Sequence, residues 1–224
     1  MNSSKKSILN SNFTYLAAFV LPVIMMMALY YTRGIFPWGN ECYLRSDMYH
    51  QYAPFFSELW HKIRNGESLT YSWNIGMGTN FTSLFAYYLA SPSNWFVALF
   101  PQKYTIEIMN AFIILKIAGS SLSLTYYLTK HNNNKHVIAA IFGMFYGMSG
   151  FIAAYSWNIM WLDCVILIPL IMLGLERLVN ENRCIFYCIT LGLCIFTNYY
   201  IAIMVCLSVC LLYTSDAADE ARSV

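Results

Sequence analysis

The chain has 224 residues, of which 58% are hydrophobic and 11% charged, and its formal net charge is +2. Ordinary water-soluble domains have a smaller apolar share and about a quarter charged residues, so this composition favours a protein largely surrounded by lipid. The lysines and arginines are scattered and form no basic stripe, which argues against a nucleic acid partner. The seven cysteines lie mostly within apolar runs and show no disulfide framework or zinc-ligand spacing.

Five apolar segments are long enough to cross a bilayer as helices, which takes about 20 mostly apolar residues each. They are residues 13–31, 106–129, 136–154, 162–179 and 184–207. No small-residue cleavage site follows the first segment, so we expect it to remain as an anchor. The sequence therefore predicts an all-α polytopic membrane protein with about five transmembrane helices.

Lysines and arginines occur at alternate ends of these segments, where the positive-inside rule places the cytoplasm. They are Lys5 and Lys6 before the first span, Lys130 and Lys135 between the second and third, and Arg177 and Arg183 between the fourth and fifth. The N-terminus is therefore predicted to be cytoplasmic. Residues 32–105 and the short segment 155–161 are predicted to lie outside.

The long outer loop contains an amphipathic helical pattern. Apolar side chains recur there at the spacing of one helical face, namely Met48, Tyr52, Phe55, Phe56, Leu59, Trp60 and Ile63. The opposite stripe is polar and comprises Asp47, Gln51, Glu58 and His61, with His50 beside it. We expect a helix on the outer membrane surface, with Ser46 as N-cap, Pro54 as a kink or in the first turn, and Gly66 as the stop. The following residues, 73–95, are expected to be irregular and seated at the membrane interface.

Asp47 is the first candidate for chemistry. It follows the first span closely and begins the surface helix, where partial burial would raise a carboxyl pKa toward working pH and suit a general base. A structural carboxylate stabilised by the helix dipole is the alternative. With His50, three residues later, Asp47 could also bind a divalent metal, although two ligands are a weak pattern and a solvated helix face explains them as well.

Lys116 lies in the middle of the second apolar segment, where a cation is costly and so suggests a function. Its ammonium could bind a lipid phosphate or pair with Glu107 or Asp163. Asp163 itself stands at the entrance of the fourth span, where an aromatic belt does not explain a carboxylate. In the fifth span, Asn198, Tyr199 and Tyr200 could contact a sugar or hydrogen-bond between helices.

Several short motifs occur in order along the chain: Arg45-Ser-Asp47, Gln51-Tyr-Ala-Pro-Phe-Phe56, Gly76-Met-Gly78, Ser91-Pro-Ser-Asn94, Leu115-Lys116 and Trp161-Leu-Asp163. Over residues 10–209 their order and spacing resemble the N-terminal part of the YfhO family of bacterial membrane proteins. That family is similar to C-type glycosyltransferases, which transfer a sugar from a polyprenyl-phosphate carrier to an acceptor outside the cytoplasm. The resemblance implies a bacterial plasma membrane location, a base or metal-ligand role for Asp47, and a longer protein with further spans.

The predicted function is therefore sugar transfer on the outer face, from a polyprenyl-phosphate donor to a cell-envelope polymer or lipid. Asp47 would act as the catalytic base, and Arg45 and Lys116 would stabilise the leaving phosphate. Further candidates for substrate binding are Asp163, His50 and Gln51. A transporter or flippase of a lipid-linked precursor and a non-catalytic membrane scaffold are the alternatives.

The end of the sequence is unusual. Residues 210–220 read Cys-Leu-Leu-Tyr-Thr-Ser-Asp-Ala-Ala-Asp-Glu, and Ala-Arg-Ser-Val follows. This string resembles the translation of a transposase sequencing adapter, so we expect residues 1–209 to form the native transmembrane part and residues 210–224 to be non-native. A natural acidic tail after a membrane helix is the alternative.

Overall fold

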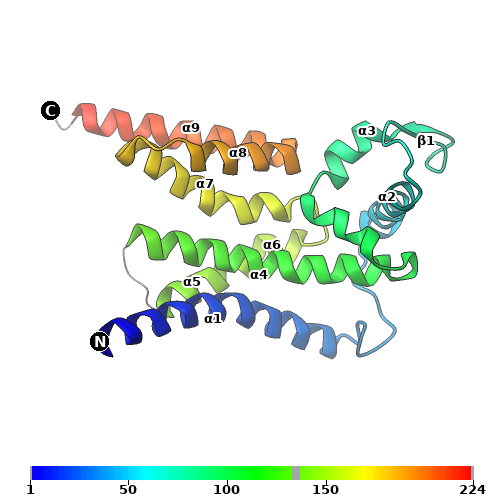
Figure 1. Ribbon diagram of the computed structural model, residues 1–224, viewed down its shortest axis with the longest axis horizontal. Coiled ribbons are helices and arrows are strands. Elements are labelled where there is room, and N and C mark those ends of the chain that lie inside the picture. The colour runs from blue at the N-terminus through cyan, green and yellow to red at the C-terminus, as the bar shows by residue number, and fades with distance from the viewer. Residues whose placement is uncertain (1, 133–136, 223–224) are drawn as a thin grey trace.

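Long helices lie side by side in the computed structural model, which describes the backbone of residues 2–132 and 137–222 and the side chains of residues 12–132, 137–212 and 214. Helix α4 (Thr105–His131) runs between α1 (Asn2–Thr32) and α7 (Leu162–Glu181) (Figure 1). The connection between α1 and α4 folds into a group of short elements at one end of these helices (Figure 1). We call this end of the helices the loop end and the short elements the loop-end group. The predicted all-α class is confirmed.

Within the described residues, three segments are long and apolar enough to cross a membrane: Asn12–Thr32, Gln102–His131 and Val137–Tyr155. The third is not one continuous helix, because α5 (Val137–Gly147) and α6 (Gly150–Tyr155) are interrupted at residues 148–149. These segments agree closely with the first three predicted spans. Helix α7 matches the fourth predicted segment in position.

Small residues let α4 and α5 approach closely. A Cβ atom on Gly147 would lie 2.8 Å from the Ile117 carbonyl oxygen, and one on Gly143 would overlap the Thr125 hydroxyl. The Ser121 hydroxyl donates to the Ala18 carbonyl of α1 over 2.6 Å. Close backbone approach and interhelical hydrogen bonds of this kind hold helices together where burial from water cannot drive packing.

The predicted fifth span, residues 184–207, is wrong as a single helix. Helix α8 (Ile185–Thr197) ends at Asn198, which has extended dihedral angles of φ −160° and ψ 104°, and α9 (Tyr199–Arg222) then runs back beside α8 (Figure 1). The Asn198 side-chain oxygen accepts from the Ile201 amide and caps α9, while its amide group donates to the Tyr87 carbonyl. Hydropathy stays high across this reversal, so an apolar run does not reveal it. At about 1.5 Å per residue, α8 alone is shorter than the bilayer core.

The loop-end group is built from short elements. In chain order they are the π-helical turn η1 (Met48–Tyr52), α2 (Ala53–Asn65), the antiparallel strands β1 (Tyr71–Ser72) and β2 (Thr79–Asn80), α3 (Phe81–Leu84), the π-helical turn η2 (Phe85–Leu89), and the 3-10 helices η3 (Pro92–Leu99) and η4 (Gln102–Tyr104). The irregular interface structure predicted for residues 73–95 therefore contains several defined turns.

The amphipathic helix is confirmed, but its apolar face packs on the protein. Met48, Phe56 and Leu59 are completely buried in a core shared with α4 and the loops, so this face is not available to lipid. Pro54 lies in the first turn of α2, and Gly66 ends the helix in the left-handed conformation at φ 66°, as predicted.

The predicted N-cap is wrong. Ser46 has a left-handed φ of 48°, and Asp47 occupies the capping position of η1 without any side-chain hydrogen bond to the helix. The turn is instead closed by the backbone, since the Tyr49 amide donates to the Ser46 carbonyl over 3.2 Å.

Glu58, expected on the solvated stripe, is buried. It accepts hydrogen bonds from Ser72 at 2.5 Å and Asn74 at 3.0 Å, and it lies 3.7 Å from the Lys62 ammonium. Lys62 also donates to the carbonyl oxygens of Ser68 and Tyr71. These charges therefore fasten the β-hairpin onto α2 rather than face water.

The short segment 155–161, predicted as an outer loop, is mostly buried against the helices. Ser156, Asn158, Ile159 and Met160 are all at most 3% exposed. Two of its polar side chains find partners: Tyr43 hydrogen-bonds Ser156 over 2.6 Å, and the Tyr52 hydroxyl donates to the Asn158 side-chain oxygen over 2.8 Å, while the Asn158 amide nitrogen has no partner among the described residues. This buried segment connects the loop-end group to α4.

Candidate functional site

Asp47 is a half-buried carboxylate without a polar partner. In the described part of the chain it takes part in no ion pair and accepts no hydrogen bond, even from the turn that it begins. A carboxylate without a protein partner keeps both oxygens available to accept hydrogen bonds from a ligand. Asp47 stands at the capping position of η1 but does not bond the helix amides.

The charge of Asp47 acts on two tyrosine side chains, Tyr52 and Tyr88. Burial raises the pKa of Tyr52, and the negative charge of Asp47 raises it further. Burial also raises the pKa of Tyr88, with additional effects from Tyr87 and Asp47. Both phenols therefore stay protonated at neutral pH and act as hydrogen-bond donors; Tyr88 points to Gln51, with 3.5 Å between the oxygens.

The two remaining polar residues of this segment differ in exposure. His50 is exposed and makes an edge contact with the Tyr49 ring, whereas Gln51 is half-buried beside Tyr88. No three His, Cys, Asp or Glu side chains gather into a metal-binding group among the described residues. Within that part of the chain, Asp47 and His50 gain no third ligand of these types.

Lys116 and Asp163 form an ion pair that does not include Asp47. The Lys116 ammonium is 2.6 Å from the Asp163 carboxylate, 3.2 Å from the Ile159 carbonyl and 3.5 Å from the Ser91 hydroxyl. These contacts use all three of its donors. Of the two carboxylates considered from sequence, Asp163 is the partner and Glu107 is not.

The two groups of candidate residues meet at the buried segment. The Asn158 side-chain oxygen accepts a hydrogen bond from the Tyr52 hydroxyl. The carbonyl oxygen of the next residue, Ile159, accepts one from the Lys116 ammonium. The Asp47 region and the Lys116–Asp163 pair are thus connected through adjacent residues. A substitution at Lys116 can consequently act on the Asp47 region without contacting a substrate.

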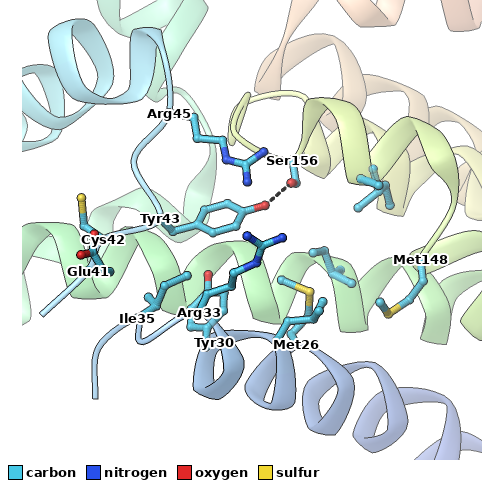
Figure 2. A pocket seen from close by; sticks show the side chains of 15 residues that line it. Met26, Tyr30, Arg33, Ile35, Glu41, Cys42, Tyr43, Arg45, Met148 and Ser156 are labelled. Atoms are coloured by element: carbon cyan, nitrogen blue, oxygen red, sulfur yellow. Dashed lines mark hydrogen bonds between the residues drawn. The ribbon is translucent and has the colours of Figure 1, made fainter. Parts of the chain in front are cut away.

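Arg45 faces a cavity of about 570 Å³ at the loop end of α1. Figure 2 shows the guanidinium groups of Arg45 and Arg33 converging on the hydrogen bond between Tyr43 and Ser156. Arg33 was not among the sequence candidates. Its position directly after the first span was the available signal, but a basic residue there is also the common flank of a membrane helix.

The interior of this cavity is apolar. Below the arginines it is lined by Met26 and Tyr30 of α1, Ile117 of α4, and Met148 and Ile152 near the α5–α6 break. A lining of apolar side chains with a few polar groups is typical of small-molecule sites. Sequence reasoning missed it because its walls come from four separate segments.

The aromatic residues of the predicted fifth span also reach the loop end. Tyr199 and Tyr200 lie at the start of α9, and both rings contact Tyr87, at centroid distances of 5.6 and 6.5 Å. Tyr200 also stacks on Trp161 at 6.1 Å. The reversal at Asn198 therefore places the Tyr199 and Tyr200 rings beside Tyr87 of the loop-end group.

Comparison with known proteins identifies one family. The sequence profile described as "Bacterial membrane protein YfhO" matches residues 17–220, nearly the whole chain and part of the segment 210–224. No curated protein and no solved structure matches the chain significantly. The match covers the apolar helices, the Asp47 segment and the cavity together, and the chain belongs to the YfhO family of bacterial membrane proteins.

Proposed function

We propose that this chain carries the donor side of a membrane glycosyltransferase, which moves a sugar from a polyprenyl-phosphate donor to a cell-envelope acceptor on the outer face. The proposal rests on the half-buried carboxylate of Asp47, which has no ion pair or hydrogen bond among the described residues, and on Arg45, two residues earlier in the chain, which lines the cavity. The two chemical needs of sugar transfer, a base and a cationic stabiliser, are met within one short segment.

The proposed step is a displacement at the anomeric carbon. Asp47 takes the proton of an acceptor hydroxyl, whose oxygen forms a new bond to the sugar. The bond between the anomeric carbon and the donor phosphate oxygen breaks, and polyprenyl phosphate leaves as an anion. Arg45 stabilises the negative charge that develops on the leaving group.

The other candidates take supporting roles in this proposal. Gln51 and His50 stand beside Asp47 and supply hydrogen-bonding groups for sugar hydroxyls. Lys116 and Asp163 act by positioning the buried segment, because the Lys116 donors are occupied by protein atoms. A sugar-transfer assay distinguishes this function from that of a membrane transporter.

The test is Asp47→Asn in the full-length protein, with radiolabelled polyprenyl-phosphate hexoses as donors. Asparagine keeps the size of the side chain and removes the base, so transfer should fall about 10²- to 10⁴-fold while expression is unchanged. Glu181→Gln, an exposed carboxylate at the other end of the helices, is the control and should transfer normally. Wild-type transfer by Asp47→Asn would contradict the proposal.

A further inference from the structure

Ser91 shows how far the connection between α3 and α4 reaches into the helices. Its hydroxyl accepts a hydrogen bond from the Lys116 ammonium over 3.5 Å, and Ser91 is only 1% exposed. At about 1.5 Å per residue, Lys116 is about 16 Å from the start of α4 and about 22 Å from its end. The chain therefore runs from α3 to the level of Lys116 and returns beside α4 to the loop end, where α4 begins (Figure 1).

The level of Lys116 lies inside a membrane that α4 crosses. Helix α4 is about 39 Å long, whereas the hydrocarbon core of a bilayer is about 30 Å thick. Wherever this core lies along an upright α4, Lys116 is at least about 7 Å below the surface of the core on the loop-end side. A segment that contacts Lys116 and returns to the loop end must consequently enter the hydrocarbon layer.

The side chains of this segment suit lipid. No Asp, Glu, Lys or Arg occurs between Glu67 and Lys103. The returning part, η3, buries Asn94, Val97 and Ala98 against the protein. Its other side presents four large apolar side chains, each 45–70% exposed: Trp95, Phe96, Leu99 and Phe100. An uncharged apolar face of this kind at membrane depth continues the exposed surface of α4 around Leu115 and favours contact with lipid chains.

Side-chain donors satisfy backbone carbonyls along the same segment. The Tyr87 carbonyl accepts from the Asn198 amide group over 3.1 Å, the Leu89 carbonyl from the Asn94 amide group over 3.3 Å, and the Phe100 carbonyl from the Trp60 indole over 2.6 Å. Lipid offers a carbonyl no hydrogen bond, so irregular backbone at membrane depth requires protein partners. These three bonds meet that requirement where the helical pattern is interrupted or ends.

We propose that residues 81–100 form a re-entrant hairpin, which enters the hydrocarbon layer from the loop end, turns at Ser91 and returns with the exposed face of η3 against lipid chains. Helix α3 and the turn η2 form its descending limb, and η3 forms its returning limb. Tyr88, which points to Gln51, belongs to the descending limb, so the hairpin also sets how deep the candidate site lies. The proposal concerns contact with lipid and does not require sugar transfer.

The experiment measures the membrane depth of spin labels by electron paramagnetic resonance. The full chain, with its seven cysteines replaced, carries one new cysteine at a time and is placed in nanodiscs of phosphatidylcholine and phosphatidylglycerol. Labels on Phe96→Cys and Leu99→Cys should be relaxed by oxygen and shielded from a water-soluble nickel chelate. Leu115→Cys on the exposed side of α4 is the lipid control, and Ser68→Cys, exposed between α2 and β1, is the water control.

The two test positions should also differ from each other. A 3-10 helix rises about 2 Å per residue, so the Phe96 label should lie up to about 6 Å deeper than the Leu99 label. Equal depths would show a segment lying flat on the membrane. Access of the nickel chelate as at Ser68→Cys would place the segment in water, and shielding from both reagents would show that protein covers it. Each of these three results would overturn the proposal.

A charge on the same face provides a second test. Phe96→Asp places a carboxylate in the hydrocarbon layer and should lower the melting temperature in nanodiscs by about 5 °C or more. Phe96→Leu keeps an apolar side chain at this position and is the matched control, which should melt close to the unmodified chain. Equal melting temperatures for Phe96→Asp and Phe96→Leu would contradict burial of this face in lipid.

Discussion

The Lys116 ammonium lies 2.6 Å from the Asp163 carboxylate, although the two residues are 47 positions apart in the chain. Lys116 is only 4% exposed, so its charge is stabilised almost entirely by protein groups. The pair ties the middle of α4 to the start of α7, next to the buried segment that reaches the Asp47 region. A cation inside an apolar helix is thus explained by a partner that the sequence places far away.

Breaking this pair on one side should destabilise the protein more than replacing both residues. Lys116→Met leaves the Asp163 carboxylate without its cation and should cost about 3 kcal/mol of unfolding free energy, whereas Lys116→Met with Asp163→Leu should recover much of that loss. Thermal unfolding in detergent, followed by tryptophan fluorescence, measures both variants. A double variant less stable than Lys116→Met would show that the pair is not the stabilising element.

Gly147 should tolerate no side chain. Gly147→Ala places a Cβ 2.8 Å from the Ile117 carbonyl oxygen, so α4 and α5 must separate, at a cost of about 1–3 kcal/mol. Gly192→Ala is the matched control, since no atom lies within 4 Å of a Cβ there and alanine favours helix. The same thermal unfolding measurement applies, and equal melting temperatures for the two variants would refute the close α4–α5 contact.

The β-hairpin should loosen when Lys62 loses its charge. Lys62→Met leaves the buried Glu58 carboxylate unpaired and removes the hydrogen bonds to Ser68 and Tyr71. We expect chymotrypsin to cut near Trp73 about tenfold faster, as local opening becomes less costly. Arg64→Met, an exposed cation on the same helix, should leave the cleavage rate unchanged, and a similar increase there would argue against the network.

Orientation is predicted from the loop charges and can be measured directly. In a chain whose seven cysteines are replaced, Ser68→Cys should react with a membrane-impermeant maleimide added outside, and Asn182→Cys, between α7 and α8, only after permeabilisation. The opposite pattern would invert the protein and place Asp47 on the cytoplasmic side.

Residue patterns revealed the amphipathic helix but not its neighbours. The spacing of Met48, Tyr52, Phe56 and Leu59 is a local property, so periodicity located the apolar face correctly. What covers that face depends on the folding of the chain after Gly66 and on α4. The position of Glu58 on the polar stripe likewise did not reveal that the β-hairpin buries it.

The sequence by itself determined that this protein is helical and membrane-embedded, because long apolar runs can satisfy their backbone in lipid only as helices. It also marked Asp47, Arg45, Lys116 and Asp163 as residues needing explanation. Only the tertiary structure decided that the chain reverses at Asn198, that Lys116 pairs with Asp163, and that Arg33 joins Arg45 around one cavity. Hydropathy indicates whether a segment prefers lipid or water. These three features depend instead on which segments pack against one another, and that is set by the folding of the whole molecule.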